Sequence, residues 1–114
     1  MRSARGPEFV QRGDDSAYAA ARAAMDMLGQ RWILRIVWEL EPGPLGFLEL
    51  RRRMGNCSSS MLSERLQQLA AANLTAKADT GAWELTVTGH NLATALATVW
   101  EWSETWHTES PPSR

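Results

Sequence analysis

Two short segments with helical apolar spacing, joined by a tight turn, lie in the middle of this chain of 114 residues. The apolar positions are Phe47, Leu50 and Met54 in the first segment and Leu62, Leu66 and Leu69 in the second. A helix that buries one such face leaves the opposite face to solvent or to a partner. The sequence Gly-Asn-Cys-Ser supplies the turn, and Ser58 is placed to cap the second helix. The spacing therefore predicts two short packed helices with a defined outer face.

The outer face of the second segment is rich in side chains that both donate and accept hydrogen bonds. It carries Ser60, Ser63, Glu64, Gln67 and Gln68. Hydroxyl and amide groups of this kind read base edges in the major groove of DNA, and the layout is that of a helix-turn-helix. The same spacing also fits two packed helices of any small α-helical protein. The rest of the chain has to distinguish these alternatives.

Size and composition favour one soluble domain. Apolar residues make up 44% of the chain, and no apolar run approaches the roughly 18 residues that a membrane span needs. We expect a flexible arm at 1–15, one domain at 16–109 and a short tail at 110–114, because the two ends are polar and without helical period. The N-terminal residues show no secretory signal, and one cysteine cannot form an intrachain disulfide. These features indicate a cytoplasmic protein.

The net charge of −1 is unusual for a protein that binds nucleic acid, but its distribution matters more. Residues 47–73 carry four arginines against two glutamates, whereas residues 74–114 carry two cations against five acids and residues 1–46 are balanced. The helix-turn-helix is thus the only positive block. A cluster of this size also fits a solvated face, so it gives mild support to DNA binding.

The flanking segments predict a mainly helical fold with one hairpin. We expect helices at about 16–28, ended by Gly29, and at about 30–40, ended by the sequence Glu-Pro-Gly-Pro. After Asn73, which suits a helix C-cap, two short alternating segments flank Thr80-Gly81 and predict a hairpin that packs on the helices through Leu74, Trp83 and Leu85. Thr88 is then expected to cap a last helix of roughly 18 residues. A hairpin directly after a recognition helix is a wing.

Four motifs, in order over about 80 residues from Ala24 to Trp106, resemble the HxlR-type transcriptional regulators, relatives of the MarR group. MDMLGQRW resembles the opening helix of that family, D-x-[IL]-G-G-K-W, and FLELRRRM resembles its F-x-E-L-R helix. SSSMLSERLQQL resembles its recognition helix, S-x-x-M-L-[ST]-x-R-L-x-x-L, and WELTVTGHNL resembles the Y-x-L-T-x-x-G that follows its wing. The resemblance implies a bacterial winged helix-turn-helix regulator that acts as a homodimer on a pseudo-palindromic operator.

The resemblance also implies that the N- and C-terminal helices form the dimer interface. The residues expected there are Tyr18, Met25, Leu96, Val99, Trp102 and Trp106. The aromatic side chains at the end of the chain agree, because a lone terminal helix would expose too much aromatic surface. The alternative for each tryptophan is the core of its own chain, which we favour for Trp100.

We divide the expected DNA contacts between base edges and phosphates. Ser59, Ser60, Ser63 and Glu64 are expected to face base edges, and Arg51, Arg52, Arg65, Gln68 and Lys77 to reach phosphates. For Arg65 a structural salt bridge to Glu49 or another acid is an equal alternative.

Several positions depart from the family pattern. Ser60 and Gln67 stand where relatives often carry basic residues, and Lys77 is the only cation of a short wing. We therefore expect DNA binding that is weak or strongly salt-sensitive, made through few contacts. The cysteine that relatives often carry near the start of the domain is absent, so redox sensing there is not expected. Cys57 in the turn is expected to be a small apolar plug, the alternative being an oxidation that disturbs DNA docking.

Other function classes have weaker support. A winged-helix module that binds proteins instead of DNA is the alternative that the near-neutral charge favours. An enzyme is not expected, since His90 and His107 have no third ligand at metal spacing, no glycine-rich phosphate loop occurs and Cys57 has no evident base. We expect no cofactor. A small aromatic effector between the tryptophan-bearing terminal helices is an alternative to a tryptophan stripe that belongs to the core.

Overall fold

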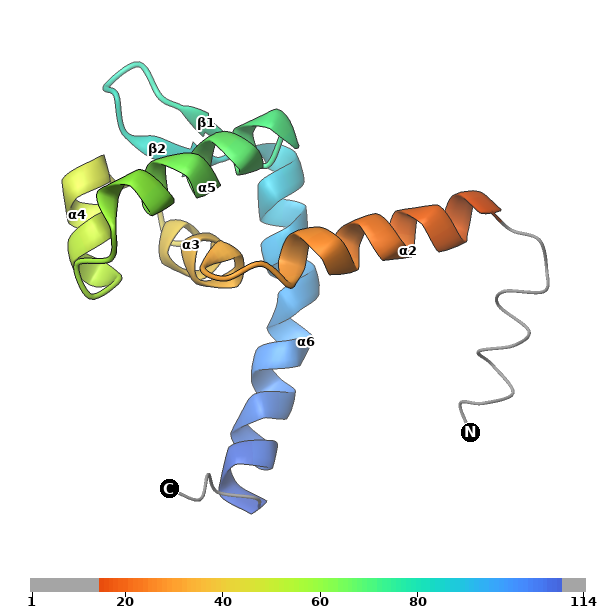
Figure 1. Cartoon of the computed structure of the whole chain (residues 1–114). Helices are drawn as coiled ribbons and strands as arrows, with labels where there is room; N and C mark the ends of the chain where they lie inside the picture. Colours follow the sequence, from red (N-terminus) through yellow and green to blue (C-terminus); the bar gives the residue numbers. More distant parts are fainter. Residues whose placement is uncertain (1–14, 110–114) are drawn as a thin grey trace, which may run out of the picture. The chain divides into compact units, whose positions relative to one another are not determined.

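A computed structural model describes residues 15–109, in the order α2, α3, α4, α5, β1, β2 and α6 (Figure 1). The predicted tail and all but the last residue of the predicted arm lie outside this range. Asp15 is the first residue of α2. The chain contacts divide the molecule into two units, with the boundary between Ile33 and Leu34.

The first unit contains α2 (Asp15–Leu28), which has no buried residue. Gly29 donates its backbone N–H to the carbonyl of Met25 and ends the helix as predicted. The expected start of the next helix at residue 30 is wrong, because Trp32 has a φ of 78°. A side chain at positive φ interrupts the right-handed backbone, so α3 (Ile33–Leu40) begins only after it.

The second unit has its core where α3, α4 (Phe47–Arg53), α5 (Ser59–Ala71), the hairpin and α6 (Val87–Glu109) meet. Its buried apolar side chains are Ile36, Val37, Leu40, Leu50, Met54, Leu62, Leu66, Leu69, Trp83, Leu85, Ala93 and Leu96. The positions predicted by helical spacing in α4 and α5 are among them, except Phe47, which is half-buried at the first residue of α4. The predicted outer faces follow from these buried ones.

The turn between α4 and α5 is a left-handed helix end. Gly55 and Asn56 have φ values of 73° and 57°, and their N–H groups donate to the carbonyls of Arg52 and Arg51 at 3.1 and 2.9 Å. These two bonds satisfy carbonyls that the end of a helix leaves without partners. Asn73 ends α5 in the same way, with a φ of 64°, as its predicted place at the end of this helix requires.

The hairpin pairs β1 (Thr75–Lys77) with β2 (Trp83–Leu85) in antiparallel register, Lys77 opposite Trp83. Leu45 adds a short third segment, since it exchanges both backbone hydrogen bonds with Trp83 at 2.8 and 3.0 Å. Trp83 and Leu85 point into the core as predicted. On β1 the inward residue is Thr75, whose hydroxyl donates to the carbonyl of Leu66, while Leu74 is only half-buried.

The cap of α6 differs from the prediction. The hydroxyl of Thr86, not of Thr88, accepts the N–H of Gly89 at 3.0 Å and donates to the carbonyl of Asn73 at 2.7 Å. The helix is consequently 23 residues long instead of about 18. Gly89 is buried against the hairpin, and a Cβ there would lie 2.1 Å from the carbonyl oxygen of Leu74. The element order is that of a winged helix-turn-helix. Within residues 15–109 no helix is both long and apolar enough to cross a membrane.

Candidate nucleic-acid interface

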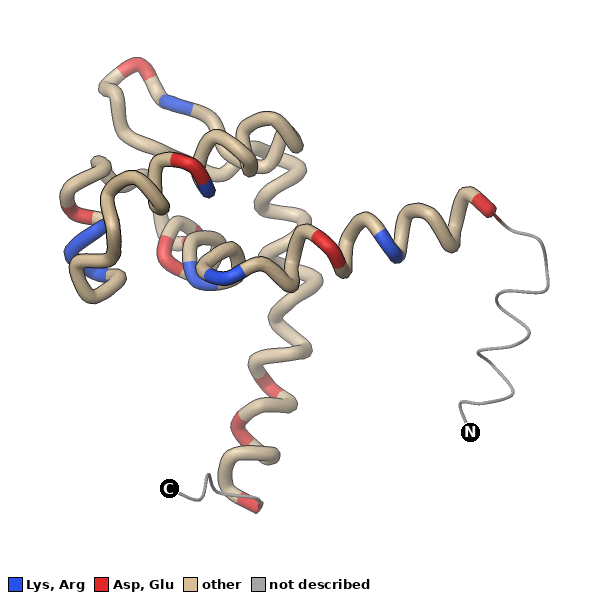
Figure 2. Tube along the Cα trace, in the orientation of Figure 1, with Lys and Arg blue, Asp and Glu red and all other residues tan. Residues whose placement is uncertain are grey.

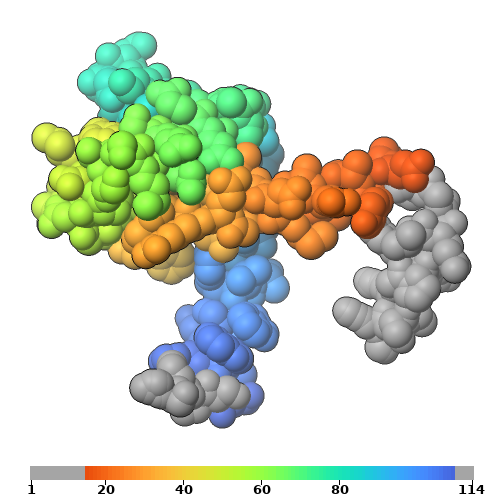
Figure 3. Space-filling model, in the orientation of Figure 1, coloured from red at the N-terminus to blue at the C-terminus, as the bar shows by residue number. Residues whose placement is uncertain are grey.

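The exposed side of α5 is a polar stripe at helical spacing. Ser60, Ser63, Glu64 and Gln67 are all exposed, and Ser59 precedes them at the first turn. Buried Leu62, Leu66 and Leu69 hold the other side of the helix against the core. In Figure 3 α5 lies at the surface of the second unit, with α4 and the wing on either side. The stripe is therefore open to a groove-sized partner.

Gln67 belongs to this stripe, whereas Gln68 does not. Gln68, expected to contact phosphate, is half-buried. The spacing places Gln67 on the predicted outer face, but Gln67 is not among the residues expected to contact DNA. Gln67 is seven residues after Ser60 and therefore lies on the same face of the helix as Ser60, Ser63 and Glu64. This spacing is the sequence signal that predicts a base contact for Gln67.

The start of α5 is closed by serine hydroxyls. The Oγ of Ser58 accepts the N–H of Met61 at 3.2 Å, as its predicted cap role requires. It also shares a hydrogen bond of 3.1 Å with the hydroxyl of Ser60. One of the hydroxyls expected to face bases is thus engaged with the cap in this structure.

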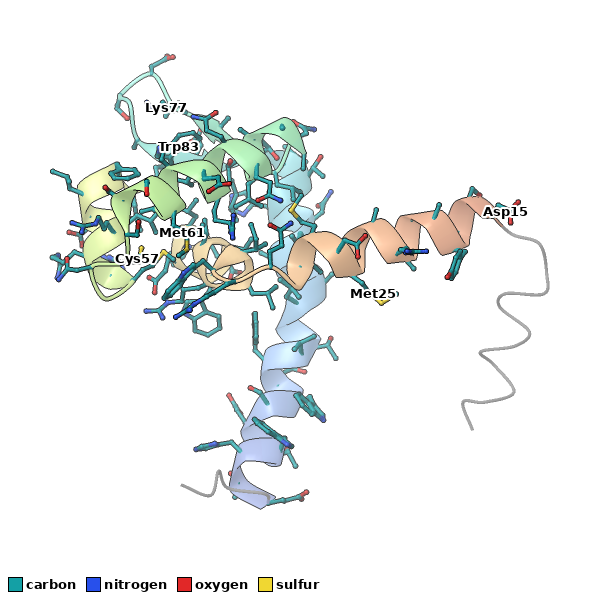
Figure 4. The ribbon with its side chains drawn as sticks, in the orientation of Figure 1. Asp15, Met25, Cys57, Met61, Lys77 and Trp83 are labelled. Atoms are coloured by element: carbon teal, nitrogen blue, oxygen red, sulfur yellow. The ribbon has the colours of Figure 1, made fainter. Side chains whose placement is uncertain are left out.

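Arg51 braces the turn of the helix-turn-helix. Its Nε donates to the carbonyl of Cys57 at 2.6 Å, in a partly buried position. The bond joins α4 to Cys57, which lies two residues before the start of α5. Cys57 itself is half-buried, and Figure 4 marks its sulfur in this turn. Sequence spacing alone assigned Arg51 to phosphate and did not reveal this internal bond.

The other two arginines of α4 share one glutamate. Arg52 and Arg53 both donate to Glu49, with Nε to carboxylate distances of 3.1 and 2.9 Å. The hydrogen bond from Arg52, and then that from Arg53, lowers the pKa of Glu49 below its ordinary value. The same bond to Glu49 raises the pKa of Arg52. The carboxylate is therefore ionised at neutral pH and offsets part of the positive charge of α4.

A second set of bonds ties α3 to the end of α4. Arg35 donates from Nη2 to the carbonyl of Arg53 at 2.7 Å and from Nε to Glu39 at 2.8 Å. Glu39 also lies 3.9 Å from the guanidinium of Arg53. Two glutamates thus offset part of the charge of the four arginines of α3 and α4. Arg65 is half-buried, and its two expected roles are a phosphate contact or a salt bridge to Glu49 or another acid. The ion pairs of Glu49 given above are those with Arg52 and Arg53.

The wing presents one lysine above an aromatic ring. The ammonium of Lys77 lies 5.5 Å from the centroid of Trp83, its partner on the facing strand (Figure 4). Lys77 is exposed and Trp83 is buried, so the ring positions the stem of the lysine while the charge faces solvent. Figure 2 shows one blue segment on the hairpin, whereas the coloured segments of α6 are all acidic.

The apolar residues expected at a dimer interface lie on two elements. On α2 the exposed ones are Tyr18 and Met25, seven residues apart and hence on one face. On α6 they are Val99, Trp102 and Trp106, and the two indoles stack with centroids 5.4 Å apart. Leu96 differs, because it is 8% exposed and buried in its own chain. Trp100 packs edge-on against Trp38 at 5.3 Å, within one chain as favoured.

The side chains that commonly ligate metal ions do not cluster in the described part of the chain. Among residues 15–109, no three His, Cys, Asp or Glu side chains lie together as metal ligands would.

Comparisons with known proteins agree with this geometry. The profile of the HxlR-like helix-turn-helix family matches residues 27–111. YvaP of Bacillus subtilis (strain 168), itself described as an uncharacterised HTH-type transcriptional regulator, is 32% identical over 89 residues, which cover 73% of this chain and 82% of YvaP.

Solved structures show the same fold. Quinone-bound YodB from Bacillus subtilis has a TM-score of 0.71 at 26% identity, covering 76% of this chain and 98% of YodB. A structure assigned to the MarR family from Enterococcus faecalis V583 has a TM-score of 0.70 at 22% identity, covering 81% and 89%, and supports the fold alone. The profile match, the identity to YvaP and the helix-turn-helix geometry together show that this chain belongs to the HxlR-like helix-turn-helix family and is a transcriptional regulator of the helix-turn-helix type.

Proposed function

We propose that this protein binds duplex DNA sequence-specifically, as a cytoplasmic homodimer on a pseudo-palindromic operator. The observation that carries the proposal is the exposed polar stripe on α5, backed by a fully buried leucine face. A helix held in this way can enter the major groove with its hydroxyl and amide groups against base edges.

The expected contacts divide by chemistry. Ser59, Ser63 and Glu64, joined by Gln67, would face bases, and Lys77 of the wing would contact a phosphate beside them. Ser60 and Arg51 would add contacts only by giving up part of the bonds to Ser58 and Cys57 described above. Arg52, Arg65 and Gln68 complete the set proposed at the backbone.

The charge arrangement supports weak binding with a shallow salt dependence. Two of the three arginines of α4 are paired with Glu49, which leaves few uncompensated cations near α5. Each phosphate contact contributes about 0.9 to the slope of log K against log salt, so few contacts give a small slope. The sequence leads us to expect DNA binding that is either weak or strongly salt-sensitive. The small number of uncompensated cations supports weak binding.

Dimer formation would pair two recognition helices about one turn of DNA apart. The exposed aromatic residues on α6 and the exposed apolar residues on α2 are the two separate surfaces that we expect to contribute. Aromatic side chains are enriched at such interfaces. A two-fold dimer would read the two halves of a pseudo-palindrome.

Selection of bound fragments from randomised duplex DNA tests the proposal. We expect enrichment of an inverted repeat whose half-sites lie about 10 base pairs apart, centre to centre. Ser63→Ala should change the enriched sequence, whereas Lys77→Ala should weaken binding evenly across sequences. Absence of any enriched sequence at low salt would contradict the proposal.

The second candidate is a winged-helix module that binds a protein and not DNA. The pairing of Arg52 and Arg53 with Glu49 favours it, since the shared carboxylate cancels one of the two positive charges and DNA affinity rests on uncompensated cations. Tight, sequence-dependent recovery of DNA fragments at moderate salt would rule it out.

A further inference from the structure

The second unit contains a groove between α3 and the C-terminal half of α6 that the DNA-binding proposal does not use. Its volume is about 580 Å³, in the range of small-molecule sites. It is lined by Leu34, Arg35, Trp38, Trp100, Ser103 and Glu104. Two indoles and one leucine make the lining largely apolar, while one carboxylate lies at its edge.

The indoles of the groove are available to a ligand. Trp38 is 50% exposed and meets half-buried Trp100 edge-on, with an angle of 90° between the rings. In this edge-to-face contact the edge of one ring covers one face of the other, so the remaining indole faces are not used by it. An aromatic face next to an open groove attracts flat rings and cations.

The charges of the groove favour a cation over an anion. Arg35 is the only cation in the lining, and its guanidinium is held by Glu39 and by the carbonyl of Arg53. Glu104 is exposed, and the part of α6 around it has no lysine or arginine. A positive ligand would therefore gain the Glu104 carboxylate as well as the two indole faces, whereas an anion would meet a compensated arginine.

The groove is separate from the aromatic surface proposed for the dimer. At 100° per residue, Trp100, Ser103 and Glu104 lie about 120° around α6 from Val99, Trp102 and Trp106. Trp100 and Glu104 therefore lie on another side of the helix than the Trp102–Trp106 stack, whereas Ser103 lies one turn from Val99.

We propose that this groove binds a planar aromatic cation, which lies against the indoles of Trp38 and Trp100 with its charge facing Glu104. The site needs no DNA, so its test is independent of the proposed operator binding.

Titration calorimetry with the full chain and three probes of matched shape tests the site. The probes are the N-methylquinolinium cation, methylquinoline kept neutral by alkaline buffer, and the naphthalene-carboxylate anion. We expect the cation to bind about tenfold more tightly than the other two, since cation–π and carboxylate contacts act only on it. Equal affinity for all three probes, or no measurable binding, would overturn the proposal.

Variants locate the site. Glu104→Gln should weaken cation binding about fivefold and leave the neutral probe unchanged, because it removes only the charge. Glu101→Gln is the matched control, since Glu101 is exposed on the same helix and outside the groove. Trp38→Leu should weaken all three probes. An equal effect of Glu101→Gln and Glu104→Gln would overturn the site, and this comparison stands even if Trp38→Leu impairs folding.

Discussion

Glu49 accepts hydrogen bonds from two consecutive arginines of α4 and so reduces the positive charge beside the recognition helix. Its depressed pKa keeps the carboxylate ionised as the pH falls to its ordinary titration range. Because the group is exposed, the pairing matters more for DNA affinity than for stability. The residue thus limits how strongly α4 attracts phosphates.

Glu49→Gln should strengthen DNA binding. Neutralising the carboxylate frees the charges of Arg52 and Arg53 for phosphates, so we expect a severalfold increase in affinity. The slope of log K against log salt should become steeper by about 0.9 for each additional phosphate that an arginine reaches. Fluorescence anisotropy with one duplex over a range of salt concentrations measures both. Glu41→Gln removes one acid from an exposed position outside α4 and is the control. An equal increase for both variants would mean that overall charge, not the pairing, is responsible.

Arg51→Met should destabilise the fold. The variant keeps the apolar stem and removes the donor to the carbonyl of Cys57, which should lower the free energy of unfolding by about 1.5–3 kcal/mol. Urea denaturation measures the change. Arg52→Met, which loses only an exposed ion pair, should lower the free energy of unfolding much less. Equal costs would show that the Arg51 bond does not brace the turn.

At the scale of elements, short contacts decide where helices begin and how closely they approach the hairpin. Thr86 joins the start of α6 to the end of α5 through a single hydroxyl. Three residues later, Gly89 brings the helix backbone against the carbonyl of Leu74. The threonine and glycine of the shared L-T-x-x-G motif therefore hold the wing against α6.

Thr86→Val should lower the free energy of unfolding by about 1–2 kcal/mol, because the isosteric methyl group can neither cap Gly89 nor donate to Asn73. Thr88→Val is the matched control at an exposed position within the first turn. Chemical denaturation of both variants compares them. A larger loss for Thr88→Val would assign the cap to Thr88, as the sequence pattern predicts.

Gly89→Ala should cost about 3 kcal/mol or more, since the new methyl group would overlap a backbone carbonyl that cannot move alone. A Cβ at Gly43 would meet nothing within 4 Å, so Gly43→Ala should change stability little. Thermal unfolding monitored by circular dichroism is sufficient for the comparison. Equal melting temperatures for the two variants would contradict the close approach.

At the scale of the whole molecule, Trp102 and Trp106 form an aromatic surface on α6 that is largely exposed to solvent in a single chain. Trp102 and Trp106 are 58% and 49% exposed, and they stack on each other. Exposed patches of this kind mark interaction surfaces. A second copy is the partner that the proposed operator symmetry requires.

Trp102→Ser should convert the dimer into a monomer and weaken operator binding by at least about tenfold, because one half-site supplies far less affinity than two. Sedimentation velocity measures the oligomeric state. Val87→Ser, which changes a still more exposed apolar residue at the other end of the same helix, should leave the dimer intact. A monomeric unsubstituted protein would contradict the proposed dimer.

The sequence by itself determined the buried faces of α4 and α5, the turn of the helix-turn-helix, the hairpin and the family. These features depend on local spacing, since leucines at three- and four-residue intervals and a Gly-Asn turn act within a few residues of each other. Spacing also identified the serine cap of α5 and the outer stripe through Gln67, but it wrongly extended the stripe to Gln68, which is half-buried.

Only the tertiary structure decided which groups satisfy one another across the fold. Three such contacts join separate segments: Leu45 pairs with Trp83, Arg51 donates to the carbonyl of Cys57, and Thr86 caps α6. The sequence pattern alone would allow other residues to make each of these contacts. The start of α3 after Trp32 also departs from the local pattern. The reason is physical: apolar periodicity is a one-dimensional signal, whereas the partner of a donor or a charge depends on which groups packing brings within about 3 Å.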